Sequence, residues 1–160
     1  MLDDTRMSIR PATHDDVQAI VQLGHELFAE SPTWSRLDLC EARLSETVVQ
    51  LIDSEDGFAW VAERGGDVVG CMLGLVDRHW ASDARVAQEL VLMLTAEARG
   101  GMLAVRLITA LVAWAQVQGA KVLHVGTSTG IADERVAGLY ERLGFSRCSI
   151  GLEMSYVHGH

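Results

Sequence analysis

The sequence predicts one α/β domain of the α+β type, with helices covering a single mixed sheet. Three observations lead to this fold class. The chain has 160 residues, 49% of them apolar and 22% charged, which suits one globular core. The spacing of apolar residues alternates along the chain between the helical and the strand period. Adjacent strands come early and strands separated by helices come late, so the sheet should be mostly antiparallel with one parallel pair.

The first third of the chain predicts a short strand and two helices. Residues 7–10 alternate in polarity, and Pro11 ends the strand. Thr13 suits the N-cap of a first helix, because acidic residues follow it and the apolar residues from 17 to 28 fall on one face. A second helix is expected over residues 37–52.

The middle of the chain predicts a hairpin and then a strand, a turn and a helix. Two apolar runs, 58–62 and 68–76, are joined by Arg64-Gly65-Gly66-Asp67, which is typical of a β-hairpin. After a polar connection, the apolar run 90–94 leads through Arg99-Gly100-Gly101 into a helix that ends near Gln118.

The last part predicts a strand, a helix and a final strand. The strands are expected over residues 121–126 and 146–156, and the helix over 134–143. Asp133 suits the N-cap of this helix, and Gly144 suits a left-handed residue just after its end. The whole chain is then expected to contain a sheet of about six or seven strands flanked by about four helices.

The turn at residues 99–104 is a candidate phosphate site. The first N–H groups of a helix lack internal partners and carry the positive end of its dipole, so they attract anions. The turn lacks both the P-loop pattern and the G-x-G-x-x-G of dinucleotide folds, which argues against a kinase or a dehydrogenase. An ordinary helix cap is the plainer alternative.

Composition restricts the partners. A net charge of −9 argues against nucleic acid and modestly favours a cationic substrate, although an acidic surface also serves solubility. No apolar run approaches the roughly 20 residues of a membrane span, so we expect no membrane partner and a cytoplasmic location. The three cysteines are far apart, and apart from His158 and His160 the histidines lack ligand spacing, so no metal is expected.

Two motifs resemble the GNAT superfamily of acyl-CoA-dependent N-acyltransferases. Arg99-Gly100-Gly101-Met102-Leu103-Ala104 is similar to the family's Q/R-x-x-G-x-G/A, with Met102 where the family usually has glycine, and residues 92–96 resemble L-x-V-x-P. Residues 136–145 are similar to A-x-x-L-Y-x-x-L-G-F. The expected order of elements agrees with the GNAT fold from residue 8 to 156, which implies one GNAT-like domain over residues 1–160. Glu89 and residues 126–131 also resemble a bacterial and phage-type GNAT group.

The resemblance implies acetyl-CoA as the cosubstrate. The backbones of Met93 and Leu94 would bond the pantetheine arm and the thioester carbonyl. The pyrophosphate would be held by the turn and the first residues of the following helix, namely Arg99, Gly100, Gly101, Met102, Leu103 and Ala104. Met102 differs from the glycine that the family usually has at this position. The difference matters only if the backbone needs a positive φ there, and Gly101 could then adopt that conformation instead.

Tyr140 and Glu89 are the catalytic candidates that the resemblance implies. Tyr140 would protonate the departing thiolate, and packing against the sheet is its plainer role. Glu89 would accept the proton of the amine, with a salt bridge as its alternative. Side chains alternate between the two faces of a strand, so Glu89 should face away from Leu92. Gln88 occupies the position where some GNAT enzymes carry their glutamate. Glu89 can therefore face the site only if a bulge shifts the alternation.

The acceptor site is expected around four residues in loops: Trp34, His79, Trp80 and Ser128. Trp34 could equally cover the edge of the core, and His79 could be a surface residue. The sequence therefore predicts an acetyl-CoA-dependent N-acetyltransferase acting on a primary amine of a small molecule or protein, by direct attack in a ternary complex. The alternative is a protein of this fold that binds acyl-CoA without turnover, and a homodimer is a possible assembly of either.

Overall fold

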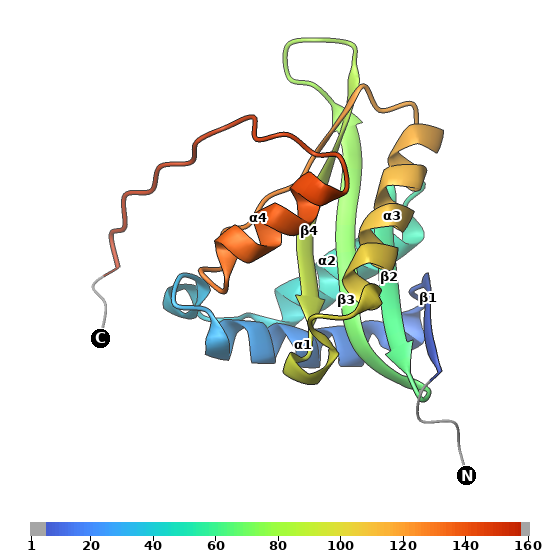
Figure 1. Cartoon of the computed structure of the whole chain (residues 1–160), viewed down its shortest axis with the longest axis vertical. Coiled ribbons are helices and arrows are strands. Elements are labelled where there is room, and N and C mark those ends of the chain that lie inside the picture. The colour runs from blue at the N-terminus through green and yellow to red at the C-terminus, as the bar shows by residue number, and fades with distance from the viewer. Residues whose placement is uncertain (1–5, 158–160) are drawn as a thin grey trace.

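The computed structural model describes residues 6–157, which form one sheet with helices on both faces (Figure 1). The strands are β1 (Met7–Pro11), β2 (Gly57–Arg64), β3 (Asp67–Arg78), β4 (Arg85–Leu94) and β5 (Val122–His124). The helices are α1 (Val17–Glu30), α2 (Glu41–Asp53), α3 (Met102–Val117) and α4 (Asp133–Arg142). Short 3-10 turns are η1 (His14–Asp16), η2 (Trp34–Leu37) and η3 (Ala96–Ala98).

The sheet has the mixed pairing that the sequence predicts. Its order is β1-β2-β3-β4-β5, and β1 to β4 pair antiparallel. β4 and β5 pair in parallel through α3, the crossover helix. The predicted hairpin between β2 and β3 is confirmed, because Gly65 and Gly66 take positive φ values of 58° and 90° at its turn.

Each face of the sheet carries its own core. α1 and α2 cover one face, where Ile20, Val48 and Val61 have no exposed surface. α3 and α4 cover the other face, turned toward the viewer in Figure 1, where Leu107 and Leu111 are fully buried. A strand residue of β4 therefore faces either the α1/α2 layer or the α3/α4 layer, depending on its parity.

The final strand predicted for residues 146–156 is wrong. The described part of the chain contains five strands rather than six or seven, and residues 146–156 are extended without a strand partner. Ion pairs join this segment to α4 and η2. Arg147 contacts Glu134 and Glu141 at 2.9 and 3.0 Å, and Glu153 contacts Arg36 at 2.6 Å.

Three predicted boundaries also differ. α2 begins at Glu41 and not near residue 37, because Asp38 has a φ of 50° that no α-helix accommodates. α4 is capped by Ala132, with a φ of 52°, while the Asp133 carboxylate accepts a hydrogen bond from Thr127. β5 pairs over three residues only. The left-handed conformation expected at Gly144 is confirmed, with a φ of 102°, and His158 and His160 lie outside the described residues.

Candidate active site

A β-bulge in β4 turns Glu89 toward the α3/α4 layer. Leu73 pairs with Val91, whereas the next residue, Gly74, pairs with Glu89, so Leu90 is the extra residue. A Cβ on Gly74 would lie 2.9 Å from the carbonyl oxygen of Gln88, which shows how closely the backbones approach there. The sequence predicts that Glu89 reaches the face of Leu92 only if β4 contains a bulge. The bulge is present, and Glu89 shares a face with Leu92.

The bulge brings Glu89 against Tyr140 of α4. The Tyr140 hydroxyl donates a short hydrogen bond to a carboxylate oxygen of Glu89. The Tyr140 side chain is buried and meets Phe145 edge to face at a ring distance of 5.3 Å. Tyr140 thus packs in the core, as its plainer predicted role requires, and also bonds the candidate base, whereas its role toward the thiolate stays a prediction.

The surroundings shift the pKa values of both residues. Burial raises the pKa of the Glu89 carboxyl to about 7, although hydrogen bonds from the Tyr140 hydroxyl and the Gly126 amide lower it. Burial and the adjacent Glu89 raise the pKa of Tyr140 well above its ordinary value. Glu89 can therefore exchange a proton near neutral pH, while Tyr140 keeps its proton until another group takes it.

Replacing Glu89 by Gln should change how stability depends on pH. The pKa of Glu89 rises from 4.5 to about 7 on folding, so its contribution to stability is fully present below pH 4.5 and is lost as the pH rises through 7. Relative to the natural chain, Glu89→Gln should gain stability between pH 5 and pH 8. Urea unfolding of both proteins at these two pH values measures the difference. An equal difference at both values would contradict the raised pKa.

β4 has an open edge beyond the bulge. Parallel pairing with β5 covers only Val86, Ala87 and Gln88, so residues 89–94 have no neighbouring strand on that side among the described residues. Thr95 N–H donates to the Val69 carbonyl oxygen, and because hydrogen-bonded pairs alternate along an antiparallel ladder, Met93 bonds Cys71 in the same way. The main-chain groups of Leu92 and Leu94 then point to the open edge. The main chain of Met93 points to β3 instead, so Leu92, which sequence reasoning did not name, joins Leu94 at this edge.

The turn after β4 leaves the start of α3 open. Gly100 has a φ of 81°, which a side chain rarely adopts, and Gly101 is the N-cap with extended backbone and no side-chain capping bond. Met102 is the first residue of α3, has no positive φ and is 55% exposed. Met102 therefore needs no glycine, and Gly100 rather than Gly101 carries the conformation that requires one. Leu103 and Ala104 are buried in the first turn of the helix.

Two arginines flank this turn in different ways. Arg99 forms a two-pronged ion pair with Glu30 of α1, at 2.6 and 2.5 Å, and its Nε donates to the Leu94 carbonyl oxygen. The Arg99 guanidinium therefore fastens the turn to α1. Arg135 of α4 is exposed, and its guanidinium lies 3.5 Å from where a Cβ on Gly100 would be. Among the described residues Arg135 forms no ion pair.

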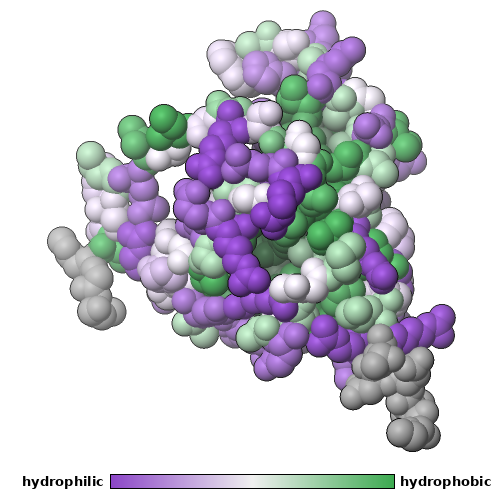
Figure 2. Space-filling model, in the orientation of Figure 1, coloured by the Kyte–Doolittle hydropathy of each residue, from purple (hydrophilic) through white to green (hydrophobic). Residues whose placement is uncertain are grey.

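Arg135 is a candidate anion-binding residue that sequence reasoning missed. One signal was readable, because a cation in the first turn of a helix opposes the helix dipole and is unfavourable without an anion nearby. Arg135 and the uncapped start of α3 face the same turn. On this side of the molecule, Figure 2 shows apolar side chains recessed between the polar side chains of α4 and the apolar surface of α3. Arg135 and the N–H groups at the start of α3 are donors of the kind that bind a phosphate.

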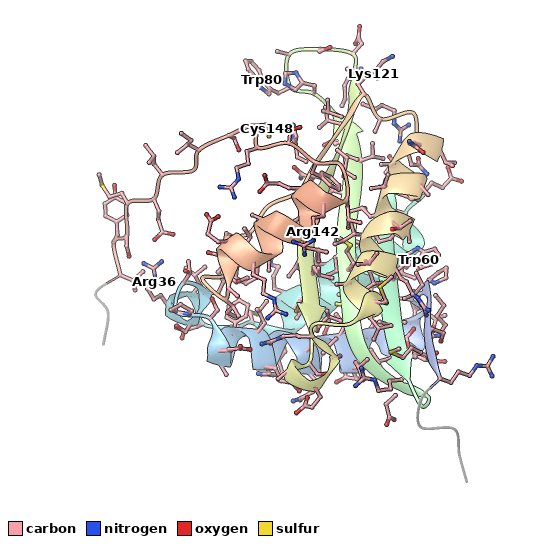
Figure 3. The ribbon with its side chains drawn as sticks, in the orientation of Figure 1. Arg36, Trp60, Trp80, Lys121, Arg142 and Cys148 are labelled. Atoms are coloured by element: carbon pink, nitrogen blue, oxygen red, sulfur yellow. The ribbon has the colours of Figure 1, made fainter. Side chains whose placement is uncertain are left out.

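The predicted acceptor residues do not all meet. Ser31 donates to the Thr129 carbonyl oxygen at 2.5 Å and accepts from the Trp34 amide at 2.9 Å, which joins η2 to the loop that carries Ser128. His79 and Trp80 instead occupy the loop between β3 and β4, and Trp80 is 92% exposed (Figure 3). This loop precedes β4 and the turn follows it, so about 30 Å of strand separates them. His79 and Trp80 therefore lie in a different loop from Trp34 and Ser128, and their role at the acceptor site stays a prediction.

A cavity of about 310 Å³ lies beside Trp34. Its walls are mostly apolar and come from α1, η2, α2 and the α1/α2 face of β4: Leu27, Phe28, Trp34, Leu37, Leu39, Leu44, Val91 and Met93. Asp38 and Arg43 are the charged residues of its lining. Val91, in the wall of this cavity, follows Glu89 by two residues, or about 7 Å along β4. The cavity and Glu89 lie on opposite faces of the sheet, and the open edge of β4 connects these two faces.

Two further findings concern residues 6–157, the part of the chain that the structure describes. No group of three or more potential metal ligands gathers there. None of the helices within that range is long and apolar enough to span a bilayer.

Comparisons with known proteins identify the family and the fold. Residues 22–145 match the acetyltransferase (GNAT) family, and no curated protein matches the sequence. A transcriptional regulator from Bacillus halodurans is similar in structure, with 18% identity, a TM-score of 0.75 and coverage of 94% of this chain and 100% of that chain. Glucosamine-6-phosphate N-acetyltransferase from Arabidopsis thaliana is also similar in structure, with 15% identity, a TM-score of 0.71 and coverage of 94% of this chain and 99% of that chain.

A third similar structure is AAC(6')-Iy in complex with a bisubstrate analog, CoA-S-monomethyl-acetylneamine. It has 17% identity, a TM-score of 0.71 and coverage of 94% of this chain and 98% of that chain. At such identities a structural likeness shows the fold, whereas the family match covers most of the sequence. The chain belongs to the acetyltransferase (GNAT) family.

Proposed function

We propose that this protein is an acetyl-CoA-dependent N-acetyltransferase in which a primary amine attacks the thioester directly in a ternary complex. The observation that carries the proposal is the contact between Glu89 and Tyr140 at the bulge, beside the open edge of β4. A carboxyl with a pKa of about 7 can accept the proton of the amine, and a hydroxyl that stays protonated can assist the departing thiolate.

The chain offers separate groups for each part of acetyl-CoA. The uncapped start of α3 and Arg135 would bind the pyrophosphate. Main-chain groups of Leu92 and Leu94 on the open edge would bond the pantetheine arm and hold the carbonyl oxygen as it gains negative charge. Because main chain does most of this work, Met102 is compatible with cofactor binding.

Glu89 and Tyr140 would move one proton from the amine to the leaving sulfur. An alkyl ammonium with a pKa near 10.4 gives its proton to a carboxylate of pKa about 7 at a cost of about 5 kcal/mol. Glu89 passes this first proton to solvent. The free amine then forms the new C–N bond, and Glu89 takes the second proton from the nitrogen as the C–S bond breaks and the thiolate takes the Tyr140 proton. Protonated Glu89 then returns a proton to the Tyr140 oxygen, which restores both residues.

Tyr140→Phe should lower turnover about tenfold and leave acetyl-CoA affinity nearly unchanged. A thiol of pKa near 8.5 can leave without full protonation, so the hydroxyl assists without being essential. The same change removes a hydrogen bond that lowers the pKa of Glu89, so the midpoint of the pH profile should move above 7. Steady-state rates from pH 6 to 9 measure both effects. Unchanged turnover would remove Tyr140 from the chemistry.

The apolar cavity beside Trp34 indicates the kind of acceptor. Its walls suit an amine on an aryl-alkyl or branched alkyl body, and Asp38 offers one carboxylate to an ammonium group. Highly hydroxylated amines would leave their hydroxyl groups without partners against such walls. We therefore expect phenethylamine or isoamylamine to have a kcat/KM at least tenfold above that of kanamycin or glucosamine.

Two measurements test the proposed function. Calorimetry with acetyl-CoA should show binding, and its absence would refute both the enzyme and the alternative, a non-catalytic acyl-CoA sensor. Release of free thiol with the amine panel then separates these two, because a sensor releases none. The chain contains one lysine, Lys121, so Lys121→Arg removes lysine self-acetylation from the background.

A further inference from the structure

One buried hydroxyl group lies where the acceptor cavity meets the loop after β5. Ser31, the residue after α1, is 1% exposed. A buried hydroxyl is unfavourable unless it is hydrogen-bonded. The Ser31 hydroxyl donates to the Thr129 carbonyl oxygen at 2.5 Å and accepts from the Trp34 N–H at 2.9 Å. It therefore joins the turn that carries Trp34 to a loop that comes 98 residues later in the chain.

Toward the acceptor cavity, Ser31 fixes the start of η2. Its hydroxyl binds the N–H of Trp34, the first residue of η2, and its carbonyl oxygen accepts from the N–H of Ser35. The indole of Trp34 meets the ring of Phe28 edge to face at a ring distance of 5.6 Å, and both rings line the cavity. The position of this cavity wall therefore depends on the Ser31 hydroxyl.

Toward the candidate base, Ser31 holds the loop at residues 126–131. Gly130, with a φ of 73°, packs so closely on the residue after Ser31 that a Cβ on it would lie 2.8 Å from Pro32 Cγ. The N–H of the first residue of this loop donates to the Glu89 carboxylate. Glu89 and the cavity lie on opposite faces of the sheet, and the loop contacts groups on both sides of the open edge of β4.

We propose that Ser31 is a positioning residue, whose hydroxyl sets how an acceptor held at Trp34 lies relative to the carboxylate of Glu89. The inference rests on the proposed function, in which Glu89 takes the proton of the amine. The hydroxyl acts through its two contacts, and neither of them involves Leu92, Leu94 or the start of α3, the groups assigned to acetyl-CoA. Its loss should therefore impair use of the amine and spare binding of the cofactor.

Ser31→Ala should lower kcat/KM for phenethylamine at least about tenfold, because a small displacement of an amine from its base is costly in rate. The dissociation constant of acetyl-CoA should stay nearly unchanged. The matched control, Ser54→Ala, removes an exposed hydroxyl between α2 and β2 that accepts from the Asp56 N–H at 3.1 Å, and it should alter neither quantity. Thiol release and calorimetry measure the two quantities.

A double-mutant cycle with Trp34 separates positioning from a general loss of stability. Trp34→Ala removes the wall through which Ser31 acts on the acceptor. Ser31→Ala should therefore lower kcat/KM much less in the Trp34→Ala background than in the natural chain. A general loss of stability would lower kcat/KM by the same factor in both backgrounds, and that result would overturn the inference.

Gly130→Ala serves as a second variant if Ser31→Ala does not fold. Gly130 is exposed, and the added Cβ would force the loop away from Pro32 while the Ser31 hydroxyl is kept. This variant should also lower kcat/KM for phenethylamine and leave acetyl-CoA affinity unchanged, and circular dichroism checks that each variant is folded.

The outcomes distinguish the inference from the proposed function. A natural chain that releases no thiol would refute the proposed function and the inference with it. An active natural chain whose kcat/KM is unaltered by Ser31→Ala, or by Gly130→Ala where Ser31→Ala does not fold, would overturn the inference alone.

Discussion

Glu89→Gln is expected to lower kcat/KM for amine acetylation by about 10² to 10⁴, the usual contribution of a positioned general base. Gln preserves the size of the side chain and can still accept a hydrogen bond from Tyr140, but it cannot take a proton. In the natural protein the rate should rise with pH through about 7, because the carboxylate is the active form. This inflection should be missing in the variant. Thiol release measured between pH 5.5 and 9 gives both results.

The matched control for this experiment is Glu55→Gln, which makes the same change at an exposed site between α2 and β2. It should leave kcat/KM and its pH dependence unaltered. Acetyl-CoA affinity should be similar in both variants and the natural chain. A Glu89→Gln protein that retains full activity, or the same pH inflection, would assign the proton transfer to another group.

Gly101→Val is expected to weaken acetyl-CoA binding at least tenfold without unfolding the protein. Gly101 has extended backbone that any residue can adopt, and a Cβ there would meet no other atom of the described chain within 4 Å. The added side chain would therefore obstruct only a ligand seated on the start of α3. Calorimetry with acetyl-CoA measures the loss, and thermal unfolding should show a small change in Tm.

Two companion variants sharpen this result. Gly101→Ala adds one carbon and should have a smaller effect than Val at the same position. Arg135→Gln should also weaken binding of acetyl-CoA, and more at low than at high ionic strength, because the lost interaction is electrostatic. Equal affinities for the natural chain and all three variants would place the pyrophosphate elsewhere.

Much of the architecture was predictable from short-range patterns. The hairpin depends on a Gly-Gly turn between two apolar runs, and the parallel pair depends on a crossover helix, so both were readable locally. The final strand was not, because alternation specifies an apolar face without specifying a partner. The starts of α2 and α4 were missed for a related reason: Asp38 and Ala132 adopt positive φ values that their residue types do not indicate.

The sequence by itself determined the order of the elements, the resemblance to the GNAT family and the candidate residues Tyr140 and Glu89, because these depend on local spacing and motif. Only the tertiary structure decided that the bulge turns Glu89 to Tyr140, that the Arg135 guanidinium lies beside Gly100, and that Trp80 is exposed in the loop between β3 and β4. Each of these depends on which segments meet across the sheet. Strand register and helix packing determine which segments lie next to each other. They depend on contacts between residues that are distant in sequence, which local sequence patterns do not indicate.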